Sequence, residues 1–191
     1  MKKIDLDLDK HTWHPSPLLG QIVLVTTLNR DGTSNLAPKS WISMMAFDPP
    51  ILALGCNLEH WTARNILERK ECVVNVPGAE LVKAVWKSSK LPHPRPVEAA
   101  GLTPMPAVKV RPPRIAECKA HLECRLDQHL AYEDEVIFLG QIVAVSVDRE
   151  ACQARDPYEY LRMPVYLEDA AYGVIERSRH IDLPEEGNCD E

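Results

Sequence analysis

The sequence predicts a single domain that is mainly β-sheet with flanking helices. Residues 21–28 form a β-branched run that leads to the turn-forming pair Asp31-Gly32, as in a β-hairpin. Two long segments of alternating apolar and polar residues, 115–127 and 136–148, supply the further strands that would complete a barrel. The 191 residues and 45% apolar content suffice for one sizeable core. We therefore expect one domain over residues 1–183.

The first half of the chain predicts an antiparallel meander. The strand at 21–28 is followed across its turn by a strand over 33–45. Asp48-Pro49-Pro50 ends this strand, because proline lacks the amide hydrogen that a strand donates. Residues 51–56 then resume as a buried strand, and 72–76 form another after an intervening helix.

Helix signals occur at three places. Thr62 is the expected N-cap of the first helix, with Trp61 and Ile66 placed to form a hydrophobic staple across its start. Apolar residues at helical spacing predict a second helix over about 80–88. A short third helix is expected near 157–162.

Residues 92–113 hold seven of the 16 prolines, a density found in interdomain linkers and in exposed loops. The first half alone offers too few strands to close a sheet, so we interpret this segment as a surface excursion within one domain. An apolar patch at 165–175 follows the third helix. The acidic segment 184–191 is expected to be a disordered tail.

Composition excludes several classes of protein. The net charge is -6, and no basic stripe interleaved with aromatic residues suggests a nucleic-acid surface. The six cysteines include no C-x-x-C pair, and the start of the chain is too acidic for a signal peptide. Reduced thiols in a cytoplasmic protein are expected. No apolar run reaches the roughly 20 residues that cross a bilayer, so we expect no membrane insertion.

The usual motifs of nucleotide, hydrolase and metal sites are absent. The eight glycines match neither G-x-G-x-x-G nor G-x-x-x-x-G-K, and no G-x-S-x-G is present. No histidine pairs recognisably with a serine or cysteine, so a catalytic triad is disfavoured. Cys118, His121 and Cys124 have a spacing that would suit a metal on a helix, but strand alternation turns His121 away from the cysteines. We interpret both cysteines as core residues and expect no metal site.

The region around Thr62 has the residues of a site for a phosphorylated planar ligand. The Thr62 hydroxyl, the Arg64 guanidinium and the free amides of a helix start form a donor set for a phosphate. The alternative is that Thr62 only caps the helix and Arg64 is solvated. His60 could contact a phosphate or a ring, or lie in an ordinary surface loop. Trp41 could stack on a cofactor, or fill the barrel or an oligomer contact.

Taken together, the motifs resemble the flavin reductase-like family, the FMN-binding split β-barrels that include flavoredoxins. The resemblance runs from about residue 17 to residue 173. Its motifs are Val-Leu-Val-Thr-Thr (23–27), Asp-Gly (31–32), Asn-Leu-Ala-Pro-x-Ser-Trp (35–41), Asp-Pro-Pro (48–50), Thr-Ala-Arg-Asn-Ile (62–66), Val-Val-Asn-Val (73–76), Ala-Gly-Leu-Thr-Pro (100–104), Leu-Glu-Cys-Arg-Leu (122–126) and Leu-Gly-Gln-Ile-Val-Ala-Val (139–145).

The resemblance implies non-covalent FMN at a homodimer interface. It places the isoalloxazine over residues 37–41 and the start of 55–57, and the phosphate near residues 62–65. No side chain would act as a catalyst, because the flavin carries the chemistry. The residues that the resemblance assigns to cofactor binding are Asn35, Ala37, Pro38, Lys39, Ser40, Trp41, Gly55, Cys56, Asn57, His60, Thr62, Arg64 and Asn65.

Two departures from the family pattern bear on function. Lys39 stands where many relatives have an apolar or small polar residue, and a cation beside the flavin's pyrimidine edge would raise its reduction potential. The proline-rich segment 92–113 differs from the more aromatic lid that is common in dedicated flavin reductases, so NAD(P)H is not assured as the electron donor. Three hypotheses about function remain open. The protein is an NAD(P)H-dependent flavin oxidoreductase that passes electrons to an acceptor, an electron carrier reduced by a protein partner, or a non-enzymatic binding barrel.

Overall fold

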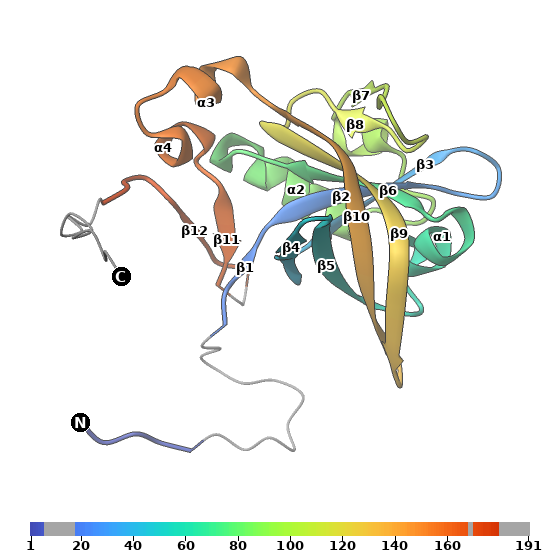
Figure 1. Ribbon diagram of the computed structural model, residues 1–191, viewed down its shortest axis with the longest axis horizontal. Coiled ribbons are helices and arrows are strands. Elements are labelled where there is room, and N and C mark those ends of the chain that lie inside the picture. The colour runs from blue at the N-terminus through green and yellow to red at the C-terminus, as the bar shows by residue number, and fades with distance from the viewer. Residues whose placement is uncertain (6–17, 168–169, 180–191) are drawn as a thin grey trace, which may run out of the picture.

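The computed structural model describes residues 1–5, 18–167 and 170–179 (Figure 1). Its main sheet is antiparallel and has seven strands in the order β3-β2-β6-β9-β10-β5-β4. The bounds of these strands, in chain order, are β2 Val23–Leu28, β3 Ser34–Lys39, β4 Ile42–Phe47, β5 Pro50–Asn57, β6 Glu71–Val76, β9 Ala120–Tyr132 and β10 Glu135–Val147. The mainly β prediction is confirmed.

The sheet curls into a barrel that does not close, because its two edge strands, β3 and β4, do not pair with each other. They are consecutive in the chain, and Ser40 and Trp41 carry the backbone from one edge to the other. The predicted strand over 33–45 is therefore two strands, and the predicted meander is wrong. The hairpin of β2 with β3 is correct, but β5 pairs with β4 and with the distant β10. Alternation along a strand shows which side is buried and does not identify its neighbour.

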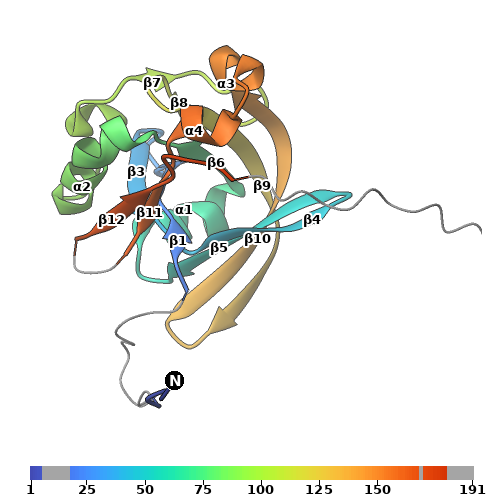
Figure 2. The same cartoon turned by 90° about the vertical axis from the view of Figure 1, so that its left-hand side faces the viewer.

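The barrel interior is an apolar core that α1 (Trp61–Arg69) helps to close. Ala63 and Ile66 of this helix are buried among core residues from five strands. The first of the two predicted long strands, 115–127, is β9, which begins at Ala120 and extends to Tyr132. β9 and β10 therefore form a long hairpin that projects beyond the barrel (Figure 2). Cys124 lies in this core, as expected.

A second apolar cluster lies on the other side of β2 and β3. The short helix η1 (Ala79–Leu81) leads into α2 (Val82–Lys90), which packs on β3, and η2 (Val97–Ala100) packs beside α2. Val97 and Leu102 are buried in this cluster with Cys118. The segment 92–113 is thus only in part the expected surface excursion, because its apolar residues complete the second cluster and shield the outer face of the sheet.

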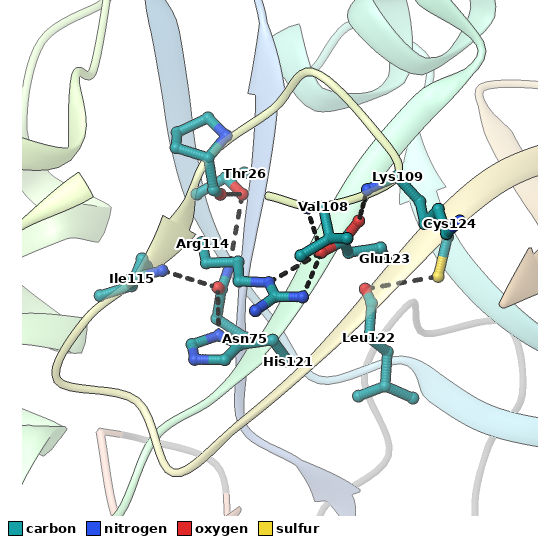
Figure 3. Close-up of polar contacts among 11 residues, drawn as sticks. Thr26, Asn75, Val108, Lys109, Arg114, Ile115, His121, Leu122, Glu123 and Cys124 are labelled. Atoms are coloured by element: carbon teal, nitrogen blue, oxygen red, sulfur yellow. Dashed lines mark hydrogen bonds and ion pairs between the residues drawn. The ribbon is translucent and has the colours of Figure 1, made fainter. Parts of the chain in front are cut away.

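A buried ion pair holds the end of the proline-rich segment on the barrel (Figure 3). β7 (Pro104–Met105) pairs with β8 (Arg114–Ile115), and Arg114 Nε donates to Glu123 Oε1 of β9 at 2.7 Å. Glu123 is fully buried and also accepts hydrogen bonds from the backbone N–H groups of Val108 and Lys109. Removing one partner of such a buried pair typically costs about 3–5 kcal/mol.

The chain ends in a small separate sheet. The predicted helix near 157–162 is present as α4 (Pro157–Leu161), and a preceding helix, α3 (Arg149–Gln153), was not predicted. The apolar patch then forms β11 (Pro164–Tyr166) and β12 (Tyr172–Val174), which pair with β1 (Gly20–Gln21) in the order β1-β11-β12. The predicted tail 184–191 lies outside the described residues. Among the residues described, no helix has the length and apolarity to span a membrane.

Candidate functional site

A cavity of about 250 Å³ opens where the end of β3 meets the start of α1. The end of α2 and the proline-rich segment form its other walls. Its lining consists of Ala37, Pro38, Lys39, His60, Trp61, Thr62, Ser89, His93 and Arg95. Five of these residues were predicted as site residues from the sequence: Ala37, Pro38, Lys39, His60 and Thr62.

Thr62 is the most informative residue of the lining. α1 begins at Trp61 with His60 as its N-cap, so the prediction that Thr62 is the N-cap is wrong. The helix starts earlier because the His60 carbonyl already accepts from the N–H of Arg64 at 3.2 Å. Thr62 therefore lies within the first turn, where its hydroxyl is buried and finds no hydrogen-bond partner among the described residues. A buried hydroxyl without a partner costs roughly 1–3 kcal/mol, which indicates a site for a hydrogen-bonding ligand.

Two cationic side chains face the same cavity. Lys39 comes from the last position of β3, and Arg95 comes from the proline-rich segment. The N–H of Leu36 donates to the Arg95 carbonyl at 2.8 Å, which ties this segment to β3. Arg95 Nε donates to the Leu91 carbonyl at 2.6 Å, so the guanidinium is held in one orientation. The chain thus brings two positive charges from distant segments into the cavity that Thr62 also lines.

Two histidines complete the polar lining. His60 Nδ1 lies 3.0 Å from Lys39 Nζ and 3.7 Å from the sulfur of Cys56. Burial, and then the positive charge of Lys39, lower the pKa of His60. His93 stacks on Trp61 with ring centroids 5.6 Å apart, and burial followed by the charge of Arg95 lowers its pKa. Both imidazoles are therefore held toward the neutral form, and the permanent charge of the cavity comes from Lys39 and Arg95.

The structure places two other predicted residues of α1 outside the cavity lining. The side chain of Arg64 is exposed on the helix. Asn65 is buried, and its amide nitrogen donates to Thr27 Oγ1 at 3.0 Å and to Asn29 Oδ1 at 2.9 Å. Asn65 thus attaches α1 to the first hairpin. This amide is buried because Asn65, like Thr62 and Ile66, lies on the buried side of α1, which packs on β2.

The remaining predicted residues lie on strands outside the cavity lining or, for Ser40 and Trp41, between β3 and β4. Asn35 is buried, and its Nδ2 donates to Thr27 Oγ1 at 3.5 Å. Trp41 is 65% exposed, with Ser40 beside it at the point where the chain changes edges. A Cβ on Gly55 would come within 3.1 Å of Trp41, so a larger residue there would require the indole to shift by a few tenths of an ångström. Asn57 Nδ2 donates to Glu135 Oε1 at 3.4 Å, across the ladder between β5 and β10.

Sequence reasoning did not predict four residues of the cavity lining. These are Trp61, Ser89, His93 and Arg95. Trp61 was expected only as a staple residue. His93 and Arg95 belong to the Pro-His-Pro-Arg-Pro run at 92–96, where the alternation of prolines with two basic side chains was the available signal. Prolines restrict the backbone, so such a run presents its side chains in a defined geometry.

Comparisons with known proteins agree with this arrangement. A model of the flavin reductase like domain matches residues 17–167. The chain is 28% identical over 149 residues to the uncharacterized protein YwrF of Bacillus subtilis, a match that covers 72% of this chain and 73% of YwrF. Flavoredoxin from Methanosarcina acetivorans superposes with a TM-score of 0.82 at 21% identity and covers 97% of both chains.

The fold also matches a protein from Shewanella frigidimarina that is described as a flavin reductase with a split barrel domain. That superposition has a TM-score of 0.77 at 20% identity and covers 87% of this chain and 86% of the other. The open barrel with unpaired edges β3 and β4 is thus the split barrel that the sequence predicted. Because the family model spans most of the chain and the fold agrees with it, this protein belongs to the family of flavin reductase-like domain proteins.

Proposed function

We propose that the protein binds FMN in the cavity beside Thr62 and transfers reducing equivalents from NAD(P)H through FMN to an acceptor. The observation that supports this most is the buried Thr62 hydroxyl, which has no partner in the described part of the chain and lines a cavity with Lys39 and Arg95. Membership of the flavin reductase-like family supports a flavin as the ligand.

The residues present fit the phosphate of FMN. A phosphate monoester carries close to two negative charges at neutral pH. Lys39 and Arg95 would balance this charge, and the Thr62 hydroxyl would donate a hydrogen bond to a phosphate oxygen. The first turn of α1, a helix of nine residues, adds backbone N–H groups that have no acceptor within the helix.

The neighbouring strand offers a surface for a flat ring. Ala37 and Pro38 line the cavity beside Lys39, and their short side chains let a planar group approach the backbone of β3. When bound, flavin supplies the redox chemistry, because its ring can accept a hydride and release electrons to an acceptor. The chain's own part is to hold the ligand, to orient its ring and to exclude water. No side chain is required as an acid or base.

A homodimer belongs to the same proposal. β4 is an edge strand, and the segment from Trp41 to Phe47 exposes apolar side chains. Trp41 is 65% exposed and Phe47 is 85% exposed, with Met44 and Met45 between them. A second copy of the chain would cover this apolar edge and extend the ligand site.

Absorption spectroscopy tests whether the protein binds FMN and whether NADH or NADPH reduces it. The purified protein is mixed with FMN, freed of unbound flavin and examined for the visible absorption of flavin. Anaerobic addition of NADH or NADPH is then expected to bleach this band. A flavin band that neither nucleotide bleaches would contradict the nucleotide donor and favour the electron carrier reduced by a protein. A protein that acquires no visible band would contradict flavin binding altogether.

A further inference from the structure

We propose that Lys39 and Cys56 fix the tautomer of His60, so that its only ring proton is on Nε2 and the residue serves as a neutral hydrogen-bond donor in the cavity. Lys39 is therefore a positioning residue that acts through His60. The tautomer is a property of the free protein, whereas its use toward a ligand rests on the proposed function.

The geometry at Nδ1 carries this inference. Lys39 Nζ lies 3.0 Å from His60 Nδ1, which is hydrogen-bond distance. An ammonium group has three donor hydrogens and no acceptor, so this nitrogen of the ring must be the acceptor. In a neutral imidazole only one nitrogen accepts, and the proton is then on the other one.

Cys56 approaches the same nitrogen from β5. Its sulfur lies 3.7 Å from His60 Nδ1, within reach of a hydrogen bond to sulfur. Burial raises the pKa of Cys56, although the nearby Lys39 opposes this, so the thiol stays protonated and can donate its S–H to this nitrogen. Two donors from two different strands therefore converge on one ring nitrogen. The hydrogen bond from Lys39 would be lost if Nδ1 carried the proton, because an ammonium group cannot accept one.

The charges around His60 also disfavour the imidazolium form. Lys39 on β3 and Arg95 on the proline-rich segment are positive and lower the pKa of His60, in addition to its burial. Glu135 on β10 and Glu59, next to His60 in the chain, act in the opposite direction. The balance lowers the pKa, so Nε2–H is a neutral donor at neutral pH.

With this tautomer, His60 has a different role in the cavity from the two cationic residues. Lys39 and Arg95 attract an anionic ligand by charge, while His60 supplies a directed hydrogen bond that does not vary with pH in the neutral range. A phosphate or carbonyl oxygen is the group that Nε2–H would recognise. A protonated His60 would instead make the binding of an anion stronger as the pH falls.

Nitrogen NMR of the histidine rings in the flavin-free protein tests the tautomer. In the wild type we expect His60 as a single neutral Nε2–H tautomer above about pH 7.5, identified by loss of its signals in His60→Gln. In Lys39→Met the Nδ1 shift should move toward a mixture of tautomers, and the titration midpoint should rise. Lys39→Arg, which keeps a cationic donor, should restore the wild-type tautomer.

The matched control is Lys90→Met, which removes a positive charge from the exposed end of α2, where Lys90 lies over the Trp86 ring. This variant should leave the His60 signals unchanged. A proton on Nδ1 of wild-type His60, or a Lys39→Met spectrum identical to the wild type, would overturn the proposal. Backbone amide spectra of each variant report folding in the same samples.

FMN affinity then tests the use of the donor. If His60 acts as a neutral donor, His60→Gln should retain more affinity than His60→Phe, because the glutamine amide also donates without charge. Equal losses in the two variants would overturn the ligand role. A wild-type protein that shows the expected tautomer but binds no FMN would overturn the proposed function and leave the tautomer assignment in place.

Discussion

We expect the Thr62 hydroxyl to destabilise the flavin-free protein and to strengthen the binding of FMN. This hydroxyl is buried with no hydrogen-bond partner within residues 1–5, 18–167 and 170–179, while valine has nearly the same shape and no polar group. Thr62→Val should therefore leave the free energy of unfolding of the flavin-free protein unchanged or increase it by up to about 2 kcal/mol. The same change should weaken FMN binding by roughly 0.5–1.5 kcal/mol, because one hydrogen bond to the ligand is lost.

Urea unfolding and flavin titration measure the two effects of Thr62→Val separately. Thr33→Val is a suitable comparison, because the Thr33 hydroxyl has a partner in the Asp31 carboxylate at 2.7 Å and lies in the hairpin turn. That variant should not affect FMN affinity. A clear loss of stability in flavin-free Thr62→Val would mean that the hydroxyl already has a partner without a ligand.

Arg95 and Arg64 offer a second test at the residue scale. Arg95 lines the cavity, and Arg64 is exposed on α1 outside the lining. Arg95→Ala should weaken FMN binding by roughly 1.5–3 kcal/mol, the usual contribution of a hydrogen bond to a charged group. Arg64→Ala should cost less, because a solvated charge contributes little. Isothermal titration calorimetry of both variants gives the comparison, and a larger loss in Arg64→Ala would shift the phosphate site to the exposed face of α1.

At the scale of elements, buried polar groups join the proline-rich segment to the barrel. Asn75 of β6 accepts at Oδ1 from the N–H of Ile115 and from Nδ1 of His121, each at 3.0 Å. Burial, and then the charge of Arg114, lower the pKa of His121 to about 4. The folded state therefore requires a neutral ring, which links the stability of this junction to pH (Figure 3).

The pKa of His121 is lower in the folded protein than in the unfolded chain, so acid should destabilise the fold. In the unfolded chain His121 has a pKa of about 6.5, so between about pH 6.5 and pH 4 the unfolded state binds more protons. The stability contributed by neutral His121 is complete above this range and is lost as the pH falls through it. Between pH 7.5 and pH 4.5 the free energy of unfolding of the wild type should therefore fall by roughly 2–3 kcal/mol more than that of His121→Gln.

Urea unfolding at pH 7.5 and at pH 4.5 measures this difference in the wild type and in His121→Gln. His129→Gln is the control, since His129 is exposed on the same strand, β9, and should leave the pH dependence unchanged. An equal loss of stability in the wild type and in His121→Gln would show that other groups account for it.

At the scale of the whole molecule, the open barrel leaves an apolar edge at β4. Phe47, 85% exposed, lies at the end of this strand. Phe47→Asp should convert a dimer to a monomer at micromolar concentration, because burying an unpaired carboxylate in an apolar interface is unfavourable. Light scattering gives the mass directly. Val108→Asp changes an apolar residue that is 69% exposed in the loop between β7 and β8 and should leave the mass unchanged. A monomeric wild type would contradict the proposed homodimer.

Much of the site could be predicted from local sequence. The helix start predicted Thr62 and His60 beside the cavity, and the family resemblance supplied Ala37, Pro38 and Lys39. Ser89, His93 and Arg95 reach the same cavity from segments more than 20 residues further along the chain. Their approach depends on the packing of α2 and of the proline-rich segment on β3, which no local pattern encodes.

The sequence by itself determined the fold class, the first hairpin and the position of the helix that begins beside the cavity, because these depend on β-branched runs, turn residues and short-range spacing. Tertiary structure decided which strands became neighbours and that Arg95, rather than Arg64, faces the cavity. It also decided that the Thr62 hydroxyl has no partner among the residues that the structure describes, and that Lys39 contacts His60. Such pairings join residues far apart in the chain, and they form only when the apolar clusters on the two sides of β2 and β3 are buried together.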